Sequence, residues 1–476
     1  MSEDFKPKER TEATISGGRA VFEIDEAHLL VALSLYPDES GQPFFDEEID
    51  QQLAALRVVR GIDSEQIQEA ISLAGSAGEP VERVIVARGE PSVRGRDAYL
   101  EYPVLDHLPK TDVDPEDPIQ LCETRIVNIR SDETIAVFHP PEEGTGGINV
   151  RGETIPVQPS VDATPKPGRQ VRWENDGIVS DIDGRLVMDE KSIHVNDTVE
   201  FEGDLTIAFG DVDFVAKIIV KQNIESGLKI RTGGDIEVHG SVIGSDIHCE
   251  GNLIVGNGIV GSEETIIEVR NDLEALFVEN ANLRVWGSCR IKDSFVTSSL
   301  LCSDSLDMSE GRGHFVSGTA STRNGITVQS IGILIGTKAK LSVGRDNLAK
   351  TRMEEVEEEL ERLENQLNEI KEVDSKAGPM TKLYQKLTPG KRDEIELLLE
   401  QIPRLEQIIS ERRDEHGSLK GRIAPAYDAI VTVHKQVCPD AIIEFPLGFH
   451  RVSEELLGVV FKYDDQTSKV EQVAAA

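Results

Sequence analysis

A short pattern that repeats along residues 203–328 constrains the fold of this chain more than any other feature. Each copy has two turn-forming residues, an apolar residue, any residue and a second apolar residue, as in "GDIEV" and "GNLIV". The first apolar positions are 31, 17, 20, 16, 17 and 20 residues apart, and a degenerate copy near "KIIV" would fill the longest gap. These positions are Leu205, Ile236, Leu253, Leu273, Cys289, Leu306 and Ile326.

A second apolar face keeps register with the first. The residues six positions earlier are Val199, Ile230, Ile247, Ile267, Leu283, Leu300 and Ala320. Two strand faces at a fixed offset, repeating about every 17 residues, indicate a chain that winds once per repeat and stacks equivalent strands. The sequence therefore predicts a mainly β protein whose core is a parallel β-helix, which we expect to be right-handed. Such a body serves equally as a scaffold or as a catalytic platform.

The cysteines fit the interior of this β-helix. The chain has five, an odd number without any CxxC spacing, which favours reduced thiols over a disulfide framework or a zinc site. Cys249, Cys289 and Cys302 fall on inward positions, where a free cysteine behaves as a small buried hydrophobe. The other two are Cys122 and Cys438.

Residues 346–420 have helical periodicity instead. Thr388 and Pro389 are typical of an N-cap and a first helical residue, and Pro403 should kink or interrupt the helix that they begin. We predict an antiparallel coiled-coil hairpin, with an intermolecular coiled coil as the alternative. Apolar residues recur at intervals of three and four at Met353, Val356, Leu360, Leu363, Leu367 and Ile370, and again at Ile395, Leu398, Ile402, Leu405 and Ile409.

The remaining segments complete the predicted organisation. Residues 1–115 form a small N-terminal α/β domain and a linker, with a helix between Asp63 and Gly75, a capping box formed by Asp63 and Gln66, and then a strand, "VERVIVARG". We expect a β-strand entry region and the β-helix at 116–345, a β segment that completes or caps it at 421–465, and a frayed tail at 466–476.

Charge and hydropathy limit the binding partners and the cellular location that we expect for this chain. The chain has 50 Lys and Arg against 87 Asp and Glu, a formal charge of −37, which would repel nucleic acid and anionic membranes from the molecule as a whole. The polar start is unlike a signal peptide, and no apolar run approaches the ~18 residues of a membrane span. We expect a cytoplasmic protein.

The glycine-rich stretch "PPEEGTGGINVRGETIPV" at 140–157 is the clearest candidate phosphate loop. It lacks the lysine and hydroxyl residue of a P-loop, and Asn149 occupies the position of the third glycine in the G-x-G-x-x-G motif. The residues that follow have the pattern of a β-strand, so no helix N-terminus is available to bind a phosphate. We interpret it as a tight turn at the entrance to the β-helix. No catalytic residue, cofactor site or metal site is predicted, because the carboxylates single out no pair and the histidines lack ligand spacing.

Four arginines stand out in this acidic chain: Arg83, Arg88, Arg94 and Arg96. Ordinary surface ion pairing is one reading, and a patch that binds an acidic partner or the glutamate-rich hairpin is the other.

Several stretches together resemble the flagellar assembly protein A family of bacterial cytoplasmic proteins. They are "ARGEPSVRGRDAYLEY" at 87–102, "PPEEGTGGINVRGETIP" at 140–156, coils of the "GDIEVHGSVIG" type and "IGTKAKLSVG" at 335–344. The chain departs from the glycine-dense family coils at 292–323. The motif glycines, to which we give structural roles, are Gly89, Gly95, Gly144, Gly146, Gly147 and Gly152.

The resemblance implies a non-enzymatic scaffold or regulator of polar flagellar assembly and motility, associated with the cell pole. Its partners would be flagellar or regulatory proteins bound by the N-terminal domain or the hairpin, and homo-oligomerisation stays open. One alternative is a module that senses a ligand or the metabolic state. Another is a β-helix enzyme, an acyltransferase or a polysaccharide-processing enzyme, although the coils lack a sustained period of six.

Overall fold

The structure is a computed structural model that describes residues 5–39, 42–106, 125–161, 165–262, 264–333, 338–377, 379–381, 383–464, 467 and 469–474. Residues 107–115 of the predicted linker and residues 116–124 of the predicted entry region, Cys122 included, lie outside the described residues. The chain divides into two compact units. Unit 1 comprises residues 1–121, 132–180 and 188–193, and unit 2 comprises residues 122–131, 181–187 and 194–476.

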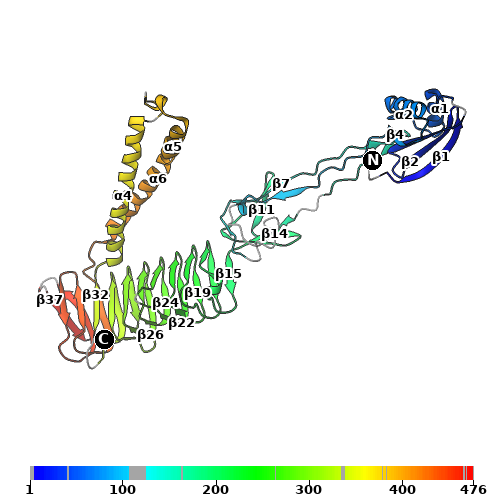
Figure 1. Cartoon of the computed structure of the whole chain (residues 1–476). Helices are drawn as coiled ribbons and strands as arrows, with labels where there is room; N and C mark the ends of the chain where they lie inside the picture. The colour runs from blue at the N-terminus through cyan, green and yellow to red at the C-terminus, as the bar shows by residue number, and fades with distance from the viewer. Residues whose placement is uncertain are drawn as a thin grey trace. The chain divides into compact units, whose positions relative to one another are not determined.

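Unit 1 begins with a four-stranded antiparallel sheet and two helices (Figure 1). Phe22 and Leu33 from the sheet pack with Ile49 and Leu53 of the first helix and Ile67 of the second. The strands, in sheet order, are β1 (Pro7–Ile15), β2 (Gly18–Asp25), β3 (Leu30–Pro37) and β4 (Val81–Arg88), and the helices are α1 (Asp46–Ala55) and α2 (Ser64–Ala77).

Helix α2 begins after the predicted N-cap and ends later than predicted. The predicted capping box is incomplete, because the Asp63 N–H donates to the Val86 carbonyl and Gln66 Nε2 donates to Glu69. The Asp63 carboxylate accepts a hydrogen bond of 3.1 Å from the Gln66 backbone N–H. The predicted end at Gly75 is wrong, because the helix continues to Ala77 and Gly78 supplies the left-handed C-cap, with φ 61°. A glycine inside a helix costs only about 1 kcal/mol relative to alanine, so Gly75 alone does not end the helix.

Residues 125–196 contain short strands, as predicted. In unit 1 one sheet has the order β11-β12-β7-β5, and β8 and β9 form a hairpin. In unit 2, β6 pairs with β13. The bounds are β5 (Tyr99–Glu101), η1 (Pro103–Leu105), β6 (Asn128–Ile129), β7 (Thr134–His139), β8 (Gly147–Ile148), β9 (Thr154–Ile155), β10 (Lys166–Pro167), β11 (Val171–Glu174), β12 (Gly177–Ser180), β13 (Gly184–Met188) and β14 (Ser192–Asn196).

Unit 2 is dominated by a β-solenoid of about 7 turns in residues 198–343, which confirms the predicted parallel β-helix (Figure 1). Its strands stack in parallel in two long sheets. One sheet contains β15 (Thr198–Phe201), β17 (Lys217–Val220), β19 (Ile236–Val238), β22 (Leu253–Val260), β24 (Leu273–Glu279), β26 (Cys289–Val296), β28 (Ser305–Met308) and β31 (Gly325–Ile331). The other contains β16 (Val212–Phe214), β18 (Lys229–Thr232), β21 (Asp246–Cys249), β23 (Ile266–Val269), β25 (Asn282–Val285), β27 (Ser298–Cys302), β30 (Gly318–Thr322) and β32 (Ala339–Val343).

The register confirms the degenerate copy and corrects the first coil. Ile218 of "KIIV" pairs with Val199 on one side and Ile236 on the other, so Val199 belongs to the first face. The second face begins at Val212, which pairs with Ile230. Leu205 lies instead on a third inward ladder, which the sequence did not reveal. It continues through Ile224, Val242, Ile259, Val278, Phe295, Phe315 and Ile331.

The turn-forming pairs of the repeat stack at one corner of the solenoid. The backbone N–H and side-chain amide of Asn252 both donate to Asp235 Oδ1, at 2.7 and 3.0 Å. A Cβ atom at Gly251 would lie 2.3 Å from the same oxygen. Gly251 therefore leaves room for the carboxylate of the preceding coil, and Gly287 does the same for Asp272.

The C-terminal segment completes the solenoid, as predicted. β33 (Ile430–Val437) and β34 (Ile442–Phe445) add parallel strands to the two sheets, and β35 (Gly448–Arg451) and β36 (Leu456–Asp464) then pair antiparallel with them. The predicted fraying is wrong at β37 (Lys469–Ala474), because its backbone pairs with β36.

A helical hairpin separates β32 from β33. It consists of α4 (Asn347–Ala377), η3 (Tyr384–Lys386), α5 (Pro389–Leu399) and α6 (Ile402–Arg422). The predicted interruption is confirmed, because α5 ends at Leu399 and Pro403 lies in the first turn of α6. The predicted apolar seam holds the hairpin together, with Leu367 and Ile370 of α4 packed against Leu405 and Ile409 of α6.

Candidate functional site

The two glycine-containing motifs of unit 1 lie side by side. The backbones of Glu90 and Ile148 exchange two hydrogen bonds of 2.8 Å, and those of Val93 and Thr145 exchange bonds of 2.9 and 3.0 Å. Val150 is fully buried in the N-terminal core, where its carbonyl accepts from the Val59 N–H at 2.8 Å. The stretch 140–157 therefore pairs with 89–97 within unit 1 and does not form a turn at the entrance to the solenoid.

Close backbone approach explains the motif glycines better than turn formation does. A Cβ atom would lie 1.9 Å from the Glu142 carbonyl oxygen at Gly95, 2.2 Å from that of Val93 at Gly144 and 2.3 Å from that of Glu90 at Gly147. Of the six motif glycines only Gly152 has a positive φ, 79°, and it closes the turn between β8 and β9. The glycines hold two chain segments together, which is a structural role.

Three of the four predicted arginines have side-chain partners within unit 1. Arg83 Nε lies 3.1 Å from Glu23 Oε2, and the carboxylate of Glu23 is nearly buried. Arg94 pairs with Asp97 at 2.8 Å, and the backbone N–H of Val161 lowers the pKa of that exposed carboxyl together with Arg94. The Arg96 guanidinium lies 5.2 Å from the centre of the Tyr99 ring. Arg88 ends β4.

The foot of the hairpin is a buried polar junction with the solenoid. Asp346 is fully buried and caps α4, because its Oδ1 accepts a hydrogen bond of 2.9 Å from the Ala349 N–H. The same oxygen accepts from the Ser303 hydroxyl of the solenoid at 2.7 Å, and Arg422 Nε of α6 lies 3.3 Å from Oδ2. The Arg422 guanidinium also lies 5.6 Å from the centre of the Trp286 ring. One carboxylate thus joins both helices to the solenoid.

The sequence analysis did not identify this junction. Asp346 directly precedes a helical apolar period, which is a recognised N-cap signal, so its capping role could have been predicted. Its contacts with Ser303 and Arg422 join positions 43 and 76 residues away along the chain, and no local signal reveals them.

Charged side chains cross the hairpin above its foot. Arg352 is the centre of a network with Glu355, Glu359 and Glu415, with Nε 2.8 Å from Glu415 Oε1. Burial on its own would raise the pKa of Glu415, but the hydrogen bond and charge of Arg352 outweigh it and hold that pKa below its usual range. The network fixes the pairing of α4 with α6.

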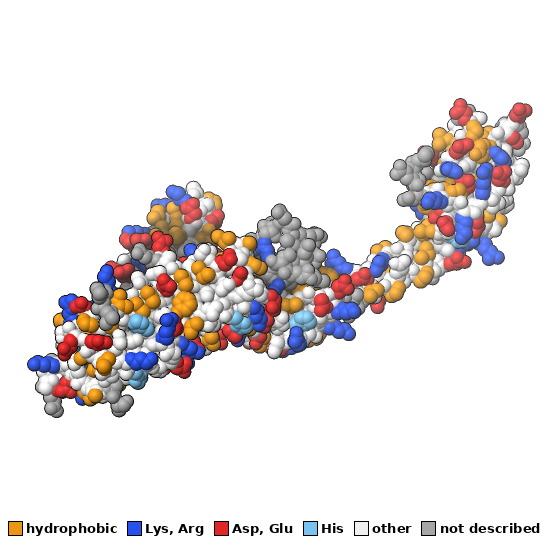
Figure 2. Space-filling model, turned by 90° about the horizontal axis from the view of Figure 1, so that it is seen from below, with side chains coloured by type: hydrophobic (Ala, Val, Ile, Leu, Met, Phe, Trp, Pro, Cys, Tyr) orange, Lys and Arg blue, Asp and Glu red, His pale blue; other side chains and the backbone are white. Residues whose placement is uncertain are grey.

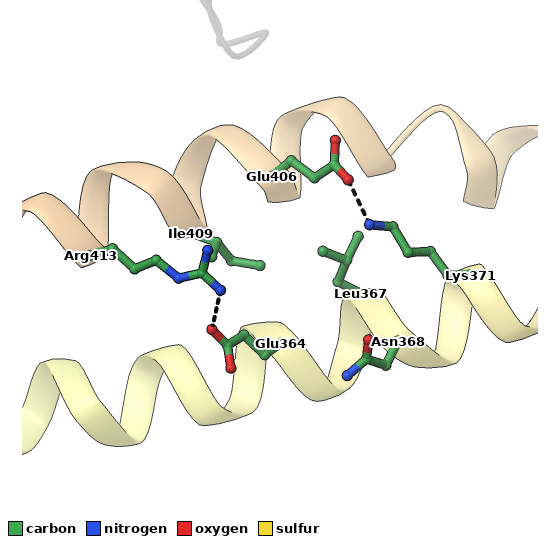
Figure 3. Close-up of a pocket in the computed structure, with 7 residues that line it drawn as sticks. All are labelled: Glu364, Leu367, Asn368, Lys371, Glu406, Ile409 and Arg413. Atoms are coloured by element: carbon green, nitrogen blue, oxygen red, sulfur yellow. Dashed lines mark hydrogen bonds and ion pairs between the residues drawn. The ribbon is translucent and has the colours of Figure 1, made fainter.

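An open groove of about 500 Å³ lies nearer the far end of the hairpin (Figure 3). Leu367 and Ile409 point toward each other across it, and ion pairs span it from Glu364 to Arg413 and from Lys371 to Glu406, both at 2.7 Å. The side chains that would recognise a ligand are thus already paired with one another. We assign the groove to the hairpin's own packing.

The solenoid surface offers shallow depressions. One of about 300 Å³ lies over the outward residues Ile254, Glu274, Arg290 and Asp307. On the face seen in Figure 2, acidic, basic and hydrophobic side chains are interspersed over the solenoid. Within the described ranges, no group of three or more His, Cys, Asp or Glu side chains is placed to hold a metal ion.

The solenoid cysteines are interior residues, as predicted. Cys249, Cys289 and Cys302 are buried to within 1% and are free thiols. Burial raises the pKa of Cys249 and of Cys302 to about 12 and that of Cys289 well above its ordinary value. None of them has the lowered pKa of a reactive nucleophile.

The described helices include none that is both long and apolar enough to span a membrane. The fold and these sites define a β-solenoid protein with an N-terminal α/β unit and a helical hairpin anchored on the solenoid. Comparison with protein families identifies both parts of this chain. Residues 197–468 match the flagellar assembly protein A beta solenoid domain, and residues 20–191 match the flagellar assembly protein A N-terminal region.

The chain therefore belongs to the flagellar assembly protein A family, which confirms the resemblance drawn from its motifs. Membership in this family implies a role in flagellar assembly. Searches of curated proteins and of solved structures found no match.

Proposed function

We propose that the protein is a non-enzymatic scaffold or regulator that acts at the cell pole in flagellar assembly and motility, through contacts with other proteins. The observation that carries the proposal is the buried junction at Asp346. It fixes a 31-residue helix to a solenoid that is itself held by three continuous apolar ladders. An arm held this firmly can present a binding surface at a set position, which is what a scaffold requires.

Chemistry at the described sites supports the same choice. The groove of the hairpin is spanned by its own ion pairs, and the solenoid thiols have raised pKa values. The motif glycines in unit 1 serve backbone pairing. The groove, the thiols and most of the motif glycines of the described residues thus have structural roles, which supports a non-enzymatic function.

The hairpin, as a coiled-coil arm, and unit 1 are the proposed partner-binding parts. In unit 1 we keep Arg88, Arg94 and Arg96 as the candidate surface for an acidic partner, since Arg83 pairs with the nearly buried carboxylate of Glu23.

Deletion and complementation test the proposal. A strain that lacks the gene should lose or misplace its flagella, and the full chain should restore them. Variants without residues 347–422 or with R88E, R94E and R96E should be present at normal levels, fail to restore flagella, and lose specific partners in affinity capture. Normal flagella in the deletion strain would refute the role in assembly. Full restoration by both variants would refute the assignment of the binding parts.

A further inference from the structure

The returning arm of the hairpin is broken into two helices, α5 and α6, at Glu400 and Gln401. Pro403 follows Leu399 by four residues, and because proline has no N–H, the Leu399 carbonyl cannot receive the hydrogen bond that a continuous helix would give it. The Gln401 N–H donates at 3.2 Å to the carbonyl of Leu398, only three residues back. The helical hydrogen-bond ladder is therefore interrupted between α5 and α6.

Side-chain packing differs on the two sides of this break. On the α6 side, Leu405 and Ile409 are buried against α4. Helix α5, all of whose residues the structure describes, has no buried residue, and its Leu397 and Leu398 are 61% and 38% exposed. Leu399, at the end of α5, packs against the buried cluster as a partly buried residue. The apolar seam that joins the two arms therefore weakens along α5.

Polar contacts tie α5 to the turn that precedes it. The Tyr384 hydroxyl on η3 donates a hydrogen bond to the Glu396 carboxylate on α5. Arg392 Nε donates in turn to the Tyr384 carbonyl at 3.1 Å, and the Arg392 guanidinium lies 5.3 Å from the centre of the Tyr384 ring. Residues 384–399, which we call the tip segment, are thus held together by their own contacts.

Ion pairs between the two arms stop before the tip segment. Near the solenoid, Arg352 of α4 pairs with Glu415 of α6 at 2.8 Å. Farther out, Lys371 of α4 pairs with Glu406 of α6 at 2.7 Å. Among the residues that the structure describes, no ion pair joins α4 to the tip segment. The charged contacts that fix α4 to α6 therefore do not hold the tip segment against α4.

We propose that the tip segment is a hinged lid, which swings away from α4 as one body at the break between Leu399 and Pro403. Hinges of this kind absorb a backbone change over a few residues at the ends of elements. In the closed form Leu399 packs against the buried cluster of Leu367 and Ile370, and opening would remove that contact and expose apolar surface at the end of the seam. The fixed part of the arm then consists of α4 and α6. This motion does not depend on the proposed role in flagellar assembly.

Distances between spin labels, measured by pulsed electron paramagnetic resonance, test the lid in the full chain. One pair, N365C with E394C, joins α4 to the tip segment, and the reference pair, N365C with S410C, joins α4 to α6. All three positions are exposed, and a C122S background leaves four native cysteines, which are buried. The distance distribution of the tip pair should be at least about twice as wide as that of the reference pair. Equal widths would overturn the proposal.

Replacing the proline should close the lid. P403A supplies the missing N–H, so α5 and α6 can form one helix, and the width for the tip pair should fall to that of the reference pair. P389A is the matched control, because Pro389 is the first residue of α5, where an N–H has no helical partner, and it should leave the width unchanged. Equal widths in P403A and P389A would overturn the assignment of the hinge.

Hydrogen exchange distinguishes a lid that swings from a segment that unfolds. A lid that moves as one body keeps the helical hydrogen bonds of α5, so the amides of residues 393–399 should exchange at least about ten-fold more slowly than unstructured amides. Y384F, which removes the hydroxyl bonded to Glu396, should speed this exchange. Exchange of the α5 amides at the unstructured rate in the unaltered chain would overturn the one-body lid.

Discussion

The Ser303 hydroxyl donates a hydrogen bond of 2.7 Å to Asp346 Oδ1, and this contact links a coil of the solenoid to the first residue before α4. Both residues are buried, so water does not replace either partner. Arg422, the last residue of α6, lies close to the other oxygen of the Asp346 carboxylate. The two ends of the hairpin are thus held at one point of the solenoid.

Replacing Asp346 by alanine should loosen the foot of the hairpin. The change removes the cap of α4 and leaves Ser303 and the Arg422 guanidinium without their shared acceptor. The free energy that holds the foot of the hairpin to the solenoid should fall by about 3 kcal/mol. Hydrogen exchange should accelerate in the first turns of α4 and the last turns of α6. Trp286 fluorescence should change in a W173F background, where it is the sole tryptophan.

D346N is the matched control for this prediction. Asparagine caps helices about as well as aspartate, so the control should retain the cap and lose mainly the charge that faces Arg422. Equal exchange rates in D346A and the unaltered chain would contradict the assigned junction. Equal destabilisation by both substitutions would assign its strength to the ion pair and not to the cap.

The pairing of the two motifs in unit 1 predicts that alanine substitution destabilises unit 1 at some motif glycines and not at others. G95A would place a Cβ 1.9 Å from the Glu142 carbonyl oxygen, so the two segments must separate, at a cost of about 1–3 kcal/mol. Urea unfolding followed by the fluorescence of Trp173, in a W286F background, should report this loss in unit 1. G146A is the matched control, because its nearest neighbour would lie at an ordinary 3.4 Å. Equal midpoints for the two variants would refute the close-approach explanation.

The solenoid was predictable from sequence because its core is periodic. Inward residues must be apolar in every coil, so Ile236, Leu253 and Leu273 mark the fold without any knowledge of contacts. The first coil was misplaced because "GDLTI" fits the repeat pattern, although Val199 belongs to the first ladder and Leu205 to the third. Periodicity shows that apolar faces repeat, but it does not show to which face each apolar residue of a coil belongs.

The sites were less predictable for a related reason. The charge at Arg83 is visible in the sequence, but its partner Glu23 is 60 residues away and is brought near only by the sheet. The motif glycines were recognised and misinterpreted, because glycine serves turns and close approaches equally and only Gly152 has the positive φ of a turn. The sequence therefore identifies residues with unusual charge or conformational freedom. Their roles depend on which residues lie next to them in the folded chain.

The buried thiols should resist alkylation in the native state. At pH 8, a pKa of about 12 leaves about one thiolate in 10⁴ for Cys249 and Cys302, and the thiolate is the reactive form. Iodoacetamide followed by mass spectrometry should label these residues, and Cys289, only after unfolding. S410C, which adds an exposed thiol on α6, is the positive control and should react in the folded chain. Rapid native labelling of Cys249 would show that the coil opens.

The Arg352 network should make the hairpin sensitive to acid. The pKa of Glu415 in the folded hairpin lies below its usual ~4.3, so its ionised form stabilises the fold above that value, and the contribution is lost as pH falls through the folded pKa. R352M should lower the free energy of unfolding of the hairpin by about 2 kcal/mol at neutral pH and remove most of this acid sensitivity. Urea titration followed by helical circular dichroism measures both effects. K371M, which breaks the exposed pair with Glu406, should cost less than about 1 kcal/mol and keep the sensitivity. Unchanged acid sensitivity in R352M would show that other carboxylates control the stability of the hairpin.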